Sequence, residues 1–150
     1  MKKLQKGFTL VELLVVIGIL AILTAVVLVA VNPGRQLIQA RDTERKAEAN
    51  QILAAITAFM ADPDNTVLLP DIQICATGAV SIYADNTAVV PDVDLSLLAP
   101  IYIAALPEDP TYGAAALGDT GYDICTADLT NKRYTVSATP EGANAISVTR

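Results

Sequence analysis

The sequence contains no histidine and no tryptophan, and it has only two cysteines. Without histidine there is neither an HExxH zinc motif nor the usual base for a serine or cysteine nucleophile. A P-loop, a G-x-S-x-G elbow and a C-x-x-C pair are missing as well. We therefore expect a protein that is not an enzyme. A single-pass membrane enzyme with an external domain is the alternative, but no set of catalytic residues supports it.

Positive charge is absent from the middle of the chain. Every lysine and arginine lies at or before Lys46 or at or after Lys132, and acidic residues fill the stretch between them. The formal net charge is −6. An acidic surface of this kind favours solubility but does not suit nucleic acid, because the phosphate backbone binds to basic surfaces. We predict no nucleic-acid partner.

A long uncharged run extends from Leu13 to Val31. It has roughly 19 residues, and a helix of that length, at about 1.5 Å per residue, nearly crosses the roughly 30 Å hydrocarbon core of a bilayer. A chain of 150 residues is too small to bury a helix that is apolar on all sides. Lipid or other copies of the helix must cover it. A cleaved secretory signal is disfavoured, because no A-x-A site lies before Asn32.

Glu12 is a carboxylate placed just inside this apolar region. An acidic group deep in a spanning helix costs about 2.5 to 3.5 kcal/mol on insertion scales, and less near the interface. We therefore expect a partner that neutralises Glu12. The alternative is a carboxylate that snorkels to the headgroups.

The segment around Glu12 resembles a known family. Three lysines precede Gly7, and the sequence FTLVELL follows it. This pattern resembles the class III leader and mature start of type IV pilins and type II secretion pseudopilins. The resemblance implies that residues 1–7 are a leader, that a prepilin peptidase cuts between Gly7 and Phe8, and that the new amine of Phe8 is N-methylated. It also implies that Glu12 attracts the Phe8 amine of a neighbouring subunit during assembly.

The expected architecture is α+β and pilin-like: a long N-terminal transmembrane and spine helix packed on a small antiparallel sheet domain. Residues 8–31 are the membrane-spanning half of this helix and residues 32–61 its amphipathic half. Asn32-Pro33-Gly34 predicts a kink in preference to a true helix end. Together the two halves would form a spine of about 80 Å if straight.

The amphipathic half has two expected faces. Asp42 and Lys46 have the i,i+4 spacing that supports a solvated face. An apolar stripe at helical spacing should dock the globular domain. Its members are Ile52, Ile56, Phe59 and Met60.

Residues 62–150 are expected to form the small globular domain. The segment 62–65 should end the helix as a capping turn and not as a calcium loop, because Val67 occupies the glycine position of an EF-hand. Runs rich in β-branched and aromatic residues predict a C-terminal antiparallel meander, with further half-buried strands before it. The meander is predicted at 122–126, 133–138 and 145–149, and the further strands at 72–75 and 80–83.

Cys75 and Cys125 are the two cysteines. Outside the cytoplasm they can form a disulfide, which we favour slightly over two buried thiols. An acidic group at Asp119, Asp123 and Asp128 offers oxygen ligands for calcium, as pseudopilins use in a C-terminal loop. Its spacing matches no calcium motif, so we predict solvated carboxylates, no metal and no cofactor, with calcium as the open alternative.

The function expected from the resemblance is that of a structural subunit of a type IV pilus-like filament. The alternative is a pseudopilin of a type II secretion or DNA-uptake system, and the segment 106–110 resembles the L-P-x-D-P motif of pseudopilins. Implied partners are further copies of the chain, a prepilin peptidase, a cytoplasmic ATPase, a membrane platform protein and inner-membrane lipid. The expected location is the bacterial inner membrane for the precursor, then a cell-surface or periplasmic filament.

Overall fold

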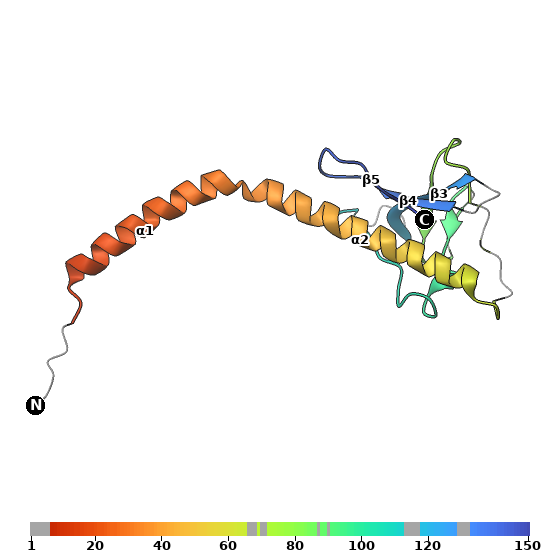
Figure 1. Ribbon diagram of the computed structural model, residues 1–150, viewed down its shortest axis with the longest axis horizontal. Helices are drawn as coiled ribbons and strands as arrows, with labels where there is room; N and C mark the ends of the chain where they lie inside the picture. The colour runs from red at the N-terminus through yellow and green to blue at the C-terminus, as the bar shows by residue number, and fades with distance from the viewer. Residues whose placement is uncertain are drawn as a thin grey trace, which may run out of the picture. The chain divides into compact units, whose positions relative to one another are not determined.

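The computed structural model describes residues 7–65, 69, 72–86, 88–89, 91–112, 118–128 and 133–150. The chain divides into two units, Met1–Leu37 and Ile38–Arg150. Two helices are followed by strands and one short 3-10 helix (Figure 1). In chain order the elements are α1 (Leu10–Val31), α2 (Pro33–Ala61), β1 (Val80–Tyr83), β2 (Val93–Asp94), η1 (Ser96–Leu98), β3 (Asp119–Asp128), β4 (Arg133–Ala138) and β5 (Ile146–Thr149).

Helix α1 is apolar on all sides. Glu12 is its only charged residue, and none of its 22 residues is buried. It ends at Val31, and the C-cap residue Asn32 has a φ of 46°, in the left-handed region. Pro33 then begins α2, because its fixed φ suits the first position of a helix. The predicted break in the helix is present and one residue long.

Helix α2 buries one face in the globular unit. Ile52, Ile56 and Phe59 lie in the core, as the apolar stripe predicts. Met60 is 41% exposed, so its assignment to the core is wrong. The helix ends at Ala61, and the Asp62 carboxylate accepts a hydrogen bond from the Asp64 amide at 2.9 Å. This end is a capping turn, as predicted.

The sheet has five strands in the order β2-β1-β3-β4-β5. Strands β3, β4 and β5 form the predicted antiparallel meander, and β1 adds to β3 in the antiparallel sense. The two-residue strand β2 is parallel to β1. The predicted strand over residues 72–75 is wrong: only Ile74 forms a bridge, to Thr126.

Gly121 bends the long strand β3. Its φ is +78°, which strongly favours glycine, and the pairing with β1 shifts register here. A Cβ at this position would lie 2.6 Å from Cγ of Tyr112. At this shift in register, the hydroxyl of the neighbouring Thr120 donates a hydrogen bond to the Ile82 carbonyl at 2.8 Å.

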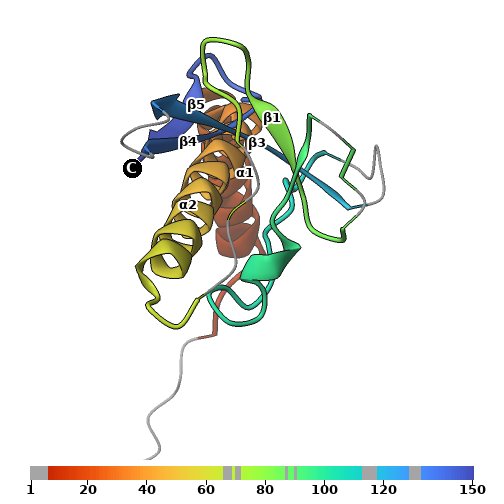
Figure 2. The same cartoon turned by 90° about the vertical axis from the view of Figure 1, so that its right-hand side faces the viewer.

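A cluster of buried apolar residues joins α2 to the inner face of the sheet, and α2 lies across the strands in Figure 2. Ile82, Ile124 and Val136 come from neighbouring strands and are fully buried. Tyr122 is also fully buried, and its hydroxyl donates to the Glu48 carboxylate of α2. The predicted α+β, pilin-like architecture is confirmed, with two more strands than the meander alone.

Candidate processing and assembly site

Residues 7–9, which precede α1, lie outside regular structure and are exposed. Gly7, Phe8 and Thr9 are not helical, and the helix begins at Leu10. A Cβ added to Gly7 would meet no atom within 4 Å, and Phe8 is 85% exposed. An exposed peptide bond outside regular structure is the kind that a peptidase can take into its active site. The lysines of the expected leader lie outside the described residues.

Glu12 forms a capping box with Thr9 at the start of α1. Its Oε2 atom accepts from the Thr9 amide at 2.9 Å and from the Thr9 hydroxyl at 2.7 Å. In return, the Glu12 amide donates to Thr9 Oγ1 at 3.3 Å. This reciprocal arrangement satisfies two amides that the first helical turn leaves without partners. Within the described part of the chain, Glu12 Oε1 accepts no hydrogen bond.

The sequence predicts the importance of Glu12 but assigns it only an intermolecular role. In a single chain, the carboxylate also fixes the start of its own helix. Thr9 and Glu12 stand three residues apart, which is the spacing of a capping box, so this signal was present in the sequence.

The apolar surface behind Glu12 is continuous. In the part of the chain that the structure describes, α1 is the one helix long and apolar enough to cross a membrane, with a mean hydropathy of 3.2. Its single hydroxyl, on Thr24, donates to the Leu20 carbonyl at 2.7 Å, so it leaves no free donor on that surface. Such a helix is suited to lipid or to packing against other apolar helices.

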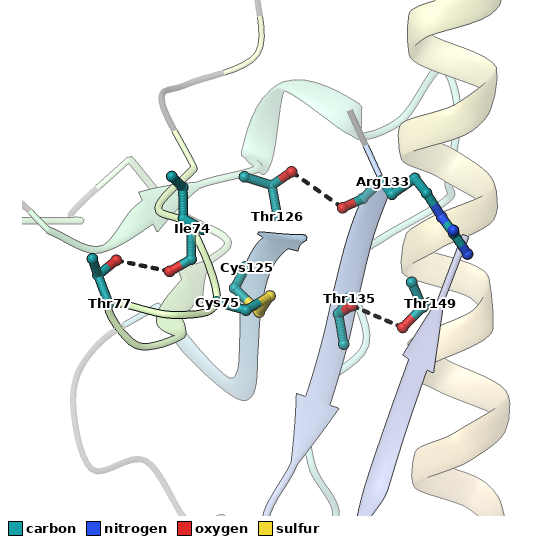
Figure 3. Close-up of a disulfide and its surroundings, with 8 residues drawn as sticks. All are labelled: Ile74, Cys75, Thr77, Cys125, Thr126, Arg133, Thr135 and Thr149. Carbon is teal, nitrogen blue, oxygen red and sulfur yellow. Dashed lines mark hydrogen bonds between the residues drawn. A yellow bond between two sulfur atoms is a disulfide. The ribbon is translucent and has the colours of Figure 1, made fainter. Parts of the chain in front are cut away.

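Cys75 and Cys125 form a disulfide with a Cα–Cα distance of 4.9 Å. Figure 3 shows the bond between Cys75 and Cys125 of β3, next to the bridge of Ile74 with Thr126. Backbone hydrogen bonds join the same two segments: the Cys75 amide donates to the Thr126 carbonyl at 2.9 Å, and the Thr126 amide to the Gln73 carbonyl at 2.8 Å. The disulfide therefore joins the segment before β1 to the middle of the sheet.

The carboxylates considered for calcium have other partners. Asp119 accepts from the Gly121 amide and from the Tyr112 hydroxyl, both at 3.0 Å. Asp123 accepts from the Ser81 hydroxyl at 3.2 Å. The side chain of Asp128 lies outside the described residues. Among the residues that are described, no group of three or more possible ligands is arranged to hold a metal ion.

Sequence reasoning missed the burial of Arg45. We expected a solvated face around Asp42 and Lys46, yet the Arg45 side chain is 1% exposed, and Asp42 pairs with Arg45. No local signal distinguishes Arg45 from the exposed Arg41, because the residues that surround it come from distant parts of the chain.

The N-terminal segment matches a known family. Residues 2–28 match the family described as the prokaryotic N-terminal methylation motif. Searches among curated proteins and among solved structures found no match to the chain. The matched residues include Gly7, Phe8, Glu12 and most of α1. The chain therefore carries the prepilin-type methylation motif on a pilin-like α+β fold, consistent with the type IV pilin and pseudopilin family.

Proposed function

We propose that this chain is a structural subunit of a type IV pilus-like filament, polymerised through its N-terminal helix. The observation that carries the proposal is a prepilin motif at residues 2–28 that includes most of α1, a helix that no part of the described chain covers. Apolar area removed from water contributes about 25 cal/mol per Å². A helix of this kind therefore gains most when other apolar helices or lipid surround it.

Processing prepares the subunit for assembly. A prepilin peptidase cuts between Gly7 and Phe8, and the new amine of Phe8 receives a methyl group. The exposure of this bond outside α1 supports the cleavage site. Cleavage also moves a positive charge to Phe8, four residues from Glu12.

Glu12 then selects the position of the next subunit. Its Oε2 atom is engaged by Thr9 of its own chain, which leaves Oε1 to accept from the Phe8 amine of a neighbour. Two unit charges about 4 Å apart attract by roughly 4 kcal/mol at an effective dielectric constant near 20. The pair therefore favours one register among the many that apolar helices alone would allow.

Other components act on the chain in this proposal. The precursor stays in the inner membrane, with α1 in lipid, until a cytoplasmic ATPase and a membrane platform protein drive its extraction. The subunit itself has a structural role and needs no cofactor. A pseudopilin that forms a short periplasmic fibre is the second candidate, supported by the L-P-E-D-P segment at residues 106–110.

The test combines mass spectrometry with filament yield for the wild type and for Glu12→Gln. Native subunits are expected to lack Met1–Gly7 and to carry one added methyl on Phe8. Glu12→Gln should still be cleaved, but its filaments should fall at least about tenfold, because the charge attraction is lost. The matched control is Glu44→Gln, which changes an exposed glutamate of α2.

Two results would contradict the proposal separately. An intact leader on the native protein rules out the processing step. Filaments of Glu12→Gln at wild-type yield rule out the assembly role of Glu12. Extended filaments sheared from cells favour the pilus, whereas fibres confined to the envelope favour the pseudopilin.

A further inference from the structure

Arg45 is a charged side chain buried in the globular unit. Its side chain is 1% exposed, although removing an isolated charge from water is strongly unfavourable. Arg41, one turn earlier on α2, is 44% exposed. The burial of Arg45 therefore needs partners that replace its hydration.

Three carboxylates and one hydroxyl surround the guanidinium. Arg45 donates to both oxygens of Asp109, from Nε at 2.6 Å and from Nη2 at 3.0 Å. Nη1 donates to Asp42 at 2.8 Å, and Nη2 donates to Glu141 at 2.8 Å and to the Thr111 hydroxyl. The Asp109 contact is a bidentate fork, which is a strong and directional form of ion pair.

The acceptors come from three segments of the chain. Asp42 belongs to α2, Asp109 and Thr111 to the stretch before β3, and Glu141 to the turn between β4 and β5. The two pairs outside α2 span 64 and 96 positions of sequence. Arg45 is thus the one cation that contacts all three segments within the described residues.

The carboxylates also hold the backbone of the two loops. Asp42 accepts from the amides of Glu141 at 3.1 Å and Gly142 at 3.0 Å. Asp109 accepts from the Thr111 amide at 2.8 Å. A Cβ at Gly142 would lie 2.7 Å from Asp42 Oδ2, so the turn approaches α2 as closely as it does because this residue is glycine.

We propose that Arg45 is the cation that latches both loops onto α2, because it pairs with carboxylates from all three segments. Carboxylate and hydroxyl oxygens are the ligands that calcium prefers. Here the guanidinium of Arg45 neutralises the charge of the carboxylates, so the loops need no metal ion to stay ordered. We call Asp42, Arg45, Asp109, Thr111 and Glu141 the Arg45 latch. This inference concerns the globular unit and is independent of the proposed filament function.

The test uses the full chain in detergent micelles, with Arg45→Met and the matched control Arg41→Met. In Arg45→Met, the rate of amide hydrogen exchange in segments 106–112 and 139–145 should rise by about tenfold or more, because the two loops open locally without Arg45. The thermal midpoint should fall by about 10 °C or more, because Asp42 and Asp109 lose their cation and Glu141 keeps only Arg41. Arg41→Met removes a pair with Glu141 in which the Arg41 side chain is 44% exposed, and it leaves every contact of Arg45 in place. It should change neither measurement by more than about 2 °C or twofold.

Loops that stay as protected in Arg45→Met as in the wild type would overturn the latch. If Arg45→Met does not fold, Arg45→Lys decides, since it keeps the charge but loses the fork. Faster exchange confined to the two loops then supports the latch, and unchanged exchange refutes it. In the wild type, neither calcium chloride nor EDTA should move the thermal midpoint. A calcium-dependent rise that Asp109→Asn removes would show that the cluster holds a metal and would overturn the role of Arg45 as its cation.

Discussion

Carboxyl groups of the Arg45 latch have lowered pKa values. Burial would raise the pKa of Asp109, but hydrogen bonds from Arg45 and Thr111 outweigh it and leave that pKa below its ordinary value. A hydrogen bond from Arg45 is the main reason that the pKa of Glu141 is lowered. The folded state therefore favours the ionised form of these groups, and their contribution is lost when they are protonated.

Asp123, on β3, behaves in the opposite way. Burial raises its pKa, and the nearby carboxylates of Asp119 and Asp92 raise it further, against the hydrogen bond from Ser81. Its ionised form is therefore disfavoured in the folded domain, and Asp123 reduces stability at neutral pH.

Acid should destabilise the domain. Unfolded Asp and Glu titrate near pH 3.9 and 4.3, so the contribution of the latch is complete above that range and is lost as pH falls through the lower folded pKa values. We expect the thermal midpoint to fall as the pH is lowered from about 5 to about 2.5. A midpoint that is flat or rises on acidification contradicts this prediction.

Asp123→Asn should raise the free energy of unfolding at pH 7 by on the order of 0.5 kcal/mol, because it removes the disfavoured charge. At low pH, where Asp123 is protonated, the substitution should not raise it.

At the scale of elements, β3 organises the sheet because both of its edges are used. Strand β4 pairs along one edge, and β1 occupies the first part of the other, up to the pair Val80 and Ile124. The segment before β1 can therefore pair only with the end of β3, which explains its single bridge at Ile74. The disulfide supplements this short pairing.

Removal of the disulfide should loosen this segment and lower stability. A cross-link between residues 50 positions apart lowers the conformational entropy of the unfolded chain. By loop entropy this adds roughly 4 kcal/mol to the free energy of unfolding. The double variant Cys75→Ser/Cys125→Ser, or reduction of the wild type, should lower the free energy of unfolding by up to about that amount. Denaturant titration in micelles measures it. Thr77→Ala, which removes one exposed hydrogen bond in the same turn, is the control, with a loss of about 1 kcal/mol or less.

Equal denaturant midpoints for the oxidised and reduced wild type would show that the disulfide adds no stability. The loop-entropy argument would then be wrong for this chain, because native packing alone would hold residues 72–78.

At the scale of the whole molecule, the two units have different environments. No residue of α1 is buried within the chain. The hydrophobic core of the second unit begins at Ala49 and uses no residue of the first. The globular unit therefore contains the residues that its own stability requires.

A fragment of residues 38–150 should fold without the first unit. We expect it to unfold in one cooperative transition, to form the disulfide and to give a dispersed amide NMR spectrum. A fragment that begins at Leu53 is the matched control, because it lacks Arg45, Ala49 and Ile52 of α2 and should not fold. A molten 38–150 fragment, or one that folds only with α1 attached, contradicts the independence of the second unit.

The N-terminal segment could be predicted from sequence because its properties are local. Hydropathy, helix length and the position of Glu12 depend on neighbouring residues, and so does the richness in β-branched and aromatic residues that predicts β3, β4 and β5. Sequence also indicated the turn at Asp62 and the break near Pro33. These predictions need no knowledge of how distant segments meet.

The tertiary structure alone decided which groups meet across the chain. It buried Arg45 and exposed Met60, although both stand on one amphipathic helix. It limited residues 72–75 to one bridge, and it decided in favour of the Cys75–Cys125 disulfide that the sequence had left open against two buried thiols. Such outcomes depend on partners tens of positions away, and the desolvation of a charge is offset only where several of those partners arrive together.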